Sequence, residues 1–164
     1  MASNKSAASI ALGGVLAALA VVVSCLGGLI PVSTFVCPMI SMLILSVVLK
    51  RCGGRIAWAW YGAVAILGLL LSPDKEAAAV FAFLGYYPIV KPKLDKLPLR
   101  WLWKLLLFNV AVLLMYWLLM HVFGMAQIMQ EFKEMGMAMT FVTLLMGNAT
   151  FFLLDRLLSI RFKI

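Results

Sequence analysis

Polar side chains are scarce in this chain, so those that interrupt its apolar runs are the first candidates for chemistry. The 164 residues include six acids, three cysteines and a single histidine, His121. No carboxylate lies near His121 in the sequence to orient it as a general base, and the cysteines lack C-x-x-C spacing. Hydrolase and nucleotide-binding motifs are absent from the sequence. We therefore expect a protein that is not an enzyme and that holds no metal or cofactor.

The remaining polar and aromatic residues predict a binding site rather than a catalytic one. Several of them fall near the expected outer ends of apolar segments, where hydroxyls, carboxylates and rings would suit a small, partly aromatic solute. The candidate substrate-binding residues are Thr34, Phe35, Asp74, Glu76, Phe81, Trp117, His121, Thr140 and Thr143. An amphipathic segment over residues 124–136 would cover this site as a lid. An interfacial anchor without any ligand is an equally open interpretation of that segment.

The composition indicates an integral membrane protein. The chain is 65% hydrophobic and only 12% charged, whereas soluble domains carry about a quarter charged residues. Long charge-free runs predict an all-α bundle of six transmembrane helices that forms one domain over residues 1–164. A short amphipathic outer segment lies between the fifth and sixth helices. The expected spans are 7–30, 35–49, 56–71, 73–90, 101–123 and 137–160.

The fourth expected span, residues 73–90, sets the orientation of the whole chain. Ser72 is the expected N-cap and Pro73 the first turn, while Asp74 and Glu76 suit the positive end of the helix dipole. A dense basic cluster follows the span, between residues 91 and 104. Because cytoplasmic loops are rich in lysine and arginine, the span begins outside the cell and ends inside.

The other basic residues agree with that orientation. Twelve of the fourteen lysines and arginines fall on the expected inner side, namely Lys5, Lys50, Arg51, Arg55, Lys91, Lys93, Lys96, Arg100, Lys104, Arg156, Arg161 and Lys163. Both termini are therefore expected in the cytoplasm, with the chain crossing the plasma membrane several times. The net charge of +8 is spread in short clusters between apolar runs, which favours an anionic lipid bilayer as the partner and not nucleic acid.

A stripe of small residues marks the first helix. Ala7, Ala11, Gly14 and Ala18 recur at helical spacing, and Gly13 and Ala17 form a second small pair beside them. Small residues let another helix approach closely within a membrane. The stripe is thus a candidate docking face for a partner protein, and internal packing within the bundle is the alternative interpretation.

Three polar or sulfur-containing features complete the candidates. Asn109 and Asn148 are expected to bond each other across two helices, with a polar site at mid-depth as the alternative. Asp155 is expected to form a local ion pair with its neighbour Arg156. Cys25 and Cys37 would both lie near the outer surface, and we expect packing roles there rather than a disulfide.

The first helix resembles that of a known family. Its run A-L-G-G-V-L-A-A-L-A-V-V-V-S, with Ala7-x-x-x-Ala11 and Gly14-x-x-x-Ala18, is similar to the substrate-binding (S) components of energy-coupling factor (ECF) transporters. Gly14 stands where that family usually has alanine. The resemblance extends to the six short helices of the chain but is specific only in this motif.

The resemblance implies a bacterial importer subunit for vitamin uptake. Such a protein binds a vitamin-like micronutrient from the outer side. Its stripe docks a transmembrane coupling subunit, and cytoplasmic ATPases supply the energy. The alternative is a non-transporting scaffold that resembles bacterial rod-shape membrane proteins and recruits partners at the inner leaflet through residues 91–104.

Overall fold

Helices make up nearly all of the chain in the computed structural model, which describes residues 2–26, 33–121 and 126–163. The described helices are α1 (Ala2–Leu26), α2 (Ser33–Cys52), α3 (Gly54–Leu71), α4 (Lys75–Leu84), α5 (Tyr87–Leu94), α6 (Arg100–His121) and α7 (Ala126–Lys163). The described ranges contain no strand, so the all-α prediction is confirmed there. Two compact units divide the chain, residues 1–96 and 97–164.

Three helical segments within the described residues are long and apolar enough to cross a membrane. They are Ala7–Leu26, Gly54–Leu71 and Arg100–Leu119. Only 17% of the residues in the first segment are buried, so most of the α1 surface faces outward. These segments support membrane association. The full set of six spans and the single-domain organisation stay predictions.

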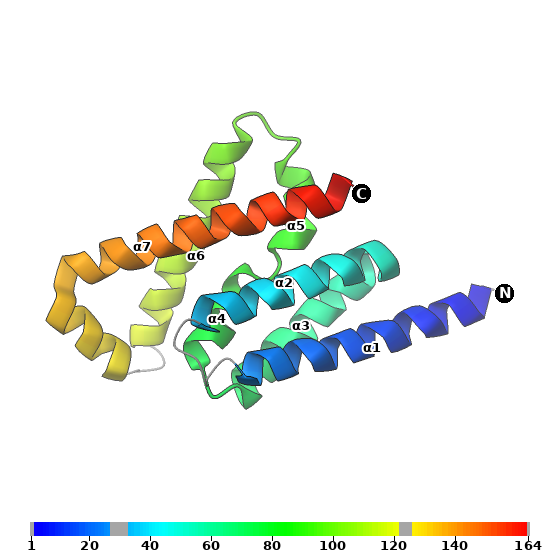
Figure 1. Ribbon diagram of the computed structural model, residues 1–164, viewed down its shortest axis with the longest axis horizontal. Coiled ribbons are helices and arrows are strands. Elements are labelled where there is room, and N and C mark those ends of the chain that lie inside the picture. The colour runs from blue at the N-terminus through cyan, green and yellow to red at the C-terminus, as the bar shows by residue number, and fades with distance from the viewer. Residues whose placement is uncertain (1, 27–32, 122–125, 164) are drawn as a thin grey trace. The chain divides into compact units, whose positions relative to one another are not determined.

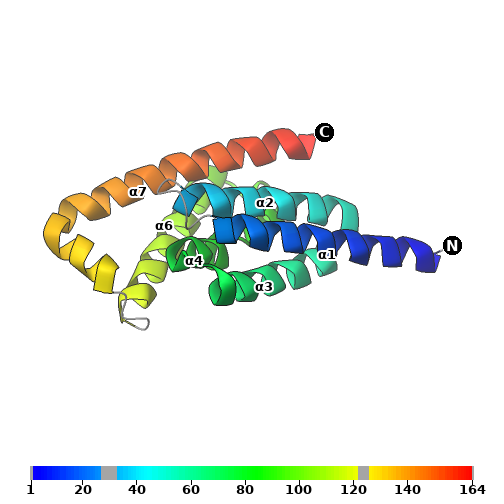
Figure 2. The same ribbon diagram turned by 60° about the horizontal axis from the view of Figure 1, so that its bottom comes forward.

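The first unit is built on three helices that lie side by side, α1, α2 and α3 (Figures 1 and 2). The α2–α3 connection is very short because Gly53 adopts a φ of 87°, a left-handed conformation that glycine reaches at little cost. The shorter helix α4 packs against α2 and α3, and α5 packs mainly against α2. The buried centre of this unit includes Leu45, Val48 and Val64, all fully shielded.

The expected fourth span is interrupted. A single helix over residues 73–90 was expected, but α4 ends at Leu84 and α5 begins at Tyr87. Pro88 has no amide hydrogen to donate to the carbonyl of Leu84, so the regular ladder fails there. A tighter turn forms instead, in which the amide of Ile89 donates a hydrogen bond to the carbonyl of Tyr86, three residues earlier, at 3.0 Å. At ten residues, α4 rises about 15 Å and is too short to cross a bilayer alone.

The start of α4 also differs from the sequence prediction. Asp74, not Ser72, is its N-cap, because the Asp74 carboxylate accepts a hydrogen bond from the Ala77 amide at 3.0 Å. Ser72 instead ends α3, where its hydroxyl donates to the carbonyl of Ser24 on α1 at 3.0 Å. Pro73 therefore lies in the connection rather than in the first turn of the helix.

The second unit is a pair of packed helices, α6 and α7. Phe108 of α6 stacks on Phe151 of α7 with ring centroids 4.7 Å apart. Gly147 lets these helices approach, because a Cβ at that position would lie 3.1 Å from the Phe108 ring. Within α7 the backbone leaves helical geometry at Gly136, with a φ of 52°. The predicted boundary between the segment 124–136 and the last helix is thereby confirmed (Figure 1).

Candidate functional site

Side chains of α3 bond directly to the backbone of α1 and set how α1 is rotated. The Trp60 indole donates to the carbonyl of Gly13 at 3.1 Å, and the Ser72 hydroxyl donates to that of Ser24. At the other end of the helix, the Cys52 thiol lies 3.3 Å from the carbonyl of Ser9. Three contacts along α1 thus hold one of its faces against its neighbours.

The small-residue stripe lies on a different face of α1. Ala7, Ala11, Gly14 and Ala18 are all exposed. A Cβ added at Gly14 would meet no atom within 4 Å, whereas one added at Gly13 would contact Ile56 of α3 at 3.8 Å. Gly13 and Gly14 therefore have different surroundings. Gly13 packs inside the unit, and the stripe remains available to another helix.

Large apolar side chains border the stripe. Ile10 is 62% exposed and Val15 is 68% exposed, and Leu19 is also exposed. A helix that docks on Gly14 and Ala18 would therefore cover apolar side chains on both sides. Close backbone approach over the small residues would be combined with burial of larger ones at the edges, as in packed membrane helices.

Some of the predicted substrate-site residues lie in the first unit. There, Phe81 and Asp74 contribute to packing and to helix capping. Phe81 is buried, with its ring 5.9 Å from that of Tyr61 and 6.4 Å from that of Trp60. Asp74 caps α4, and Glu76 lies half-buried in its first turn. Thr34 and Phe35 belong to α2, and their side chains lie outside the described residues.

One buried hydroxyl of the first unit lacks a hydrogen-bond partner among the described residues. Ser41 of α2 is fully shielded, and its Oγ accepts and donates no hydrogen bond among the described residues. Five residues further on, Ser46 is equally buried but donates to the carbonyl of Leu43 at 2.6 Å. Buried polar atoms are almost always hydrogen-bonded, so Ser41 has an unused capacity to bind a polar group.

The part of the predicted site in the second unit lies at the end of α6. The rings of Trp117 and His121 stack with centroids 5.1 Å apart, and both side chains are exposed. His121 Nδ1 lies 3.1 Å from the carbonyl of Trp117, one turn earlier. Thr140 and Thr143 lie on α7, and their side chains are outside the described residues. The lid function of residues 124–136 stays a prediction.

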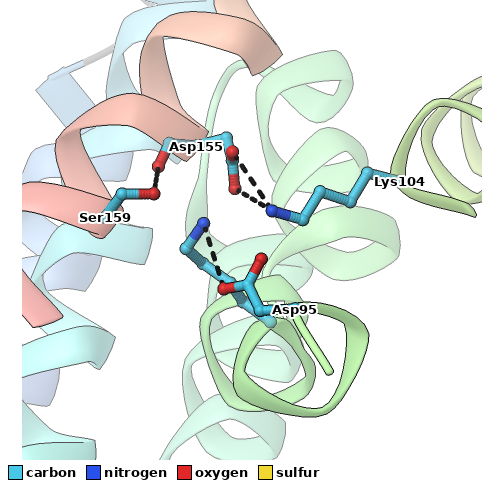
Figure 3. Close-up of polar contacts among 5 residues, drawn as sticks. Asp95, Lys104, Asp155 and Ser159 are labelled. Atoms are coloured by element: carbon cyan, nitrogen blue, oxygen red, sulfur yellow. Dashed lines mark hydrogen bonds and ion pairs between the residues drawn. The ribbon is translucent and has the colours of Figure 1, made fainter. Parts of the chain in front are cut away.

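A buried ion pair in the second unit corrects the expectation for Asp155. Its carboxylate lies 3.0 and 3.2 Å from Nζ of Lys104 on α6, and each side chain is about 95% shielded from solvent (Figure 3). Arg156, the expected partner, is exposed. Adjacent residues of a helix point in directions about 100° apart, so Asp155 can face α6 while Arg156 faces outward. Sequence reasoning counted Lys104 only as a basic flank of a loop.

Lys91 is a second cation that sequence reasoning assigned to a loop. It belongs to α5 and is only 1% exposed. Its Nζ lies 3.7 Å from Asp95, one turn away, and 6.0 Å from the centre of the Tyr87 ring. The surprising feature is the depth of burial, since lysine is rarely shielded to this extent. The spacing of four residues between Lys91 and Asp95 was the signal in the sequence for their ion pair.

The predicted asparagine pair is confirmed. Asn109 and Asn148 exchange two amide hydrogen bonds across α6 and α7, at 3.3 and 3.1 Å. Each amide nitrogen also donates to the carbonyl four residues earlier in its own helix, at 2.8 Å. The two side chains therefore fulfil the structural role that was expected for them.

The remaining sequence candidates are the cysteines and the possible metal ligands. All three cysteines are free, so Cys25 and Cys37 form no disulfide in this structure. Among the described residues, no three histidine, cysteine, aspartate or glutamate side chains gather where they could hold a metal ion. In comparisons with known proteins, no family model, curated protein or solved structure matches the chain. The assignment of function therefore depends on the residues themselves.

Proposed function

We propose that the chain is the membrane-embedded substrate-binding subunit of an importer of the ECF type, for a vitamin-like micronutrient. One observation carries the proposal. The small-residue stripe on α1 is exposed, while neighbouring positions on the same helix are held inward by α3. This is the arrangement required if Ala7, Ala11, Gly14 and Ala18 dock a transmembrane coupling subunit.

The proposal divides the work between this chain and its partners. The chain binds the solute from the outer side, and cytoplasmic ATPases provide energy through the coupling subunit. Within the first unit, the candidate solute contacts remain Thr34, Phe35, Asp74, Glu76 and Phe81. Ser41 joins them, because a solute with a hydrogen-bonding group would satisfy its buried hydroxyl.

A pair of matched variants tests the docking face. Gly14→Leu and Ala18→Leu should abolish co-purification with the coupling subunit, because leucine prevents close helix approach. Ala8→Leu is the control, since Ala8 is also exposed on α1 but lies outside the stripe, one turn before Leu12. All three proteins should insert into the membrane normally. Unchanged co-purification of the Gly14 and Ala18 variants would exclude this face as the docking surface.

Ligand binding is tested by thermal unfolding in detergent. A solute present at a hundred times its Kd should stabilise the folded protein by about 2.7 kcal/mol, and a panel of vitamins can be screened for that shift. Ser41→Ala should weaken the shift for an active compound. A broad panel without any stabilising compound would favour the non-transporting scaffold instead.

The proposed topology has six spans with both ends in the cytoplasm. In a background with the three native cysteines replaced, Lys75→Cys should react with a membrane-impermeant maleimide added outside intact cells. Arg51→Cys should react only after the membrane is permeabilised, because the α2–α3 turn faces inward. Labelling of both positions from the same side would contradict the topology.

A further inference from the structure

A concentrated positive patch lies at the turn between α2 and α3 in the first unit. Lys50 and Arg51 lie in the last turn of α2, and Arg55 lies in the first turn of α3. Only Cys52, Gly53 and Gly54 separate the two arginines, and the positive φ of Gly53 folds the helix ends together. All three cations are exposed. Neither Arg51 nor Arg55 has an ion-pair partner within the part of the chain that the structure describes.

An exposed tryptophan, Trp58, follows this patch about one turn further along α3. Trp58 follows Arg55 by three residues, so it lies on nearly the same side of the helix, about 4.5 Å further along the axis. Its side chain is 48% exposed, and its ring meets that of Tyr61 edge to face at 5.9 Å. Tryptophan indoles favour the level of lipid headgroups.

The membrane segment of α3 fixes the depth of the patch. The apolar span begins at Gly54 and continues to Leu71. Arg51 and Arg55 therefore lie where the apolar span begins, at the level at which phosphodiester groups are found. Guanidinium groups donate parallel hydrogen bonds to phosphate oxygens, and two of them can hold one anionic headgroup from both sides.

We propose that the α2–α3 turn binds the headgroup of an anionic phospholipid, with Arg51 and Arg55 on the phosphodiester and Trp58 against the glycerol region. The patch is positive and its surroundings are apolar, which matches a lipid that is negative at one end and apolar at the other. A zwitterionic lipid has the same acyl chains but no net charge to match. The inference needs only a membrane-embedded chain and is independent of the importer function.

Native mass spectrometry of the full chain tests the proposal. The protein is purified from mixtures of phosphatidylglycerol and phosphatidylcholine, and the retained lipid is counted. Phosphatidylglycerol should be retained preferentially, and Arg51→Gln/Arg55→Gln should reduce its retention at least tenfold, given about fivefold per cation near a charged surface. Inorganic phosphate should not displace the lipid, since it lacks the acyl chains.

A control variant separates a local site from general charge. Arg100→Gln/Arg156→Gln removes the same charge at exposed positions of the second unit and should retain phosphatidylglycerol. Equal loss in both double variants, or equal retention of the two lipids by the unaltered chain, would overturn the proposal. If the Arg51→Gln/Arg55→Gln variant fails to fold, the two single substitutions test the proposal instead. Each should reduce the retention of phosphatidylglycerol about fivefold.

Discussion

The Trp60 indole of α3 donates a hydrogen bond to the backbone carbonyl of Gly13 in α1, at 3.1 Å. Gly13 faces α3, where a Cβ added to it would contact Ile56 at 3.8 Å. The contact turns Gly13 toward α3, and its neighbour Gly14 is thereby directed about 100° away. One hydrogen bond thus helps to decide which small residues of α1 are available to a partner.

Loss of the Trp60 indole nitrogen should loosen the contact between α1 and α3. Trp60→Phe removes the donor, and we expect the free energy of unfolding to fall by about 1–3 kcal/mol, from the lost hydrogen bond and the reduced ring. Trp58→Phe is the control, because Trp58 is exposed and should change stability by less than about 0.5 kcal/mol. Denaturant unfolding in detergent measures both. Equal effects would mean that the hydrogen bond contributes nothing specific.

The Lys104–Asp155 pair should behave as a unit. Asp155→Leu or Lys104→Met removes one member of the buried ion pair, which should cost roughly 3–5 kcal/mol of stability. The double variant Lys104→Met/Asp155→Leu should recover most of that loss, because two apolar side chains fill the same space. A double-mutant cycle measures the coupling. Additive losses would show that the two side chains act independently.

Gly85 should not tolerate a side chain. A Cβ there would overlap the carbonyl oxygen of Phe81 and lie 3.0 Å from the Tyr61 ring. Gly85→Ala should therefore destabilise the protein by about 1–3 kcal/mol. Gly62→Ala offers a matched comparison in α3, where nothing lies within 4 Å, and it should be neutral or stabilising by up to about 1 kcal/mol. Thermal unfolding that ranks the two variants in the opposite order would contradict the packing described for Gly85.

Removing the hydroxyl of Ser41 should raise the stability of the ligand-free protein. Ser41→Ala eliminates a buried polar atom without a partner, which should stabilise the fold by about 1–3 kcal/mol. Ser46→Ala is the matched substitution in the same helix and should not stabilise, because Ser46 loses a hydrogen bond to Leu43. Thermal unfolding without added solute provides the measurement. A loss of stability in Ser41→Ala would show that its hydroxyl is already satisfied.

The sequence by itself determined the features that depend on local chemistry. Long apolar runs predicted the helical class, the glycine at position 136 predicted the break in α7, and two lone amides in apolar surroundings predicted the Asn109–Asn148 pair. The end of α4 was also within reach, because Pro88 cannot donate to Leu84. The prediction of one span over residues 73–90 followed the long apolar run and did not take Pro88 into account.

Only the tertiary structure decided which way each helix faces. A soluble helix shows its inner face by a stripe of apolar residues, but the helices here are apolar on most sides, so the sequence carries little information about their rotation. Rotation is set by contacts between residues far apart in the chain, such as Trp60 with Gly13 and Lys104 with Asp155. These contacts direct Asp155 toward α6 and leave Gly14 on the exposed side of α1.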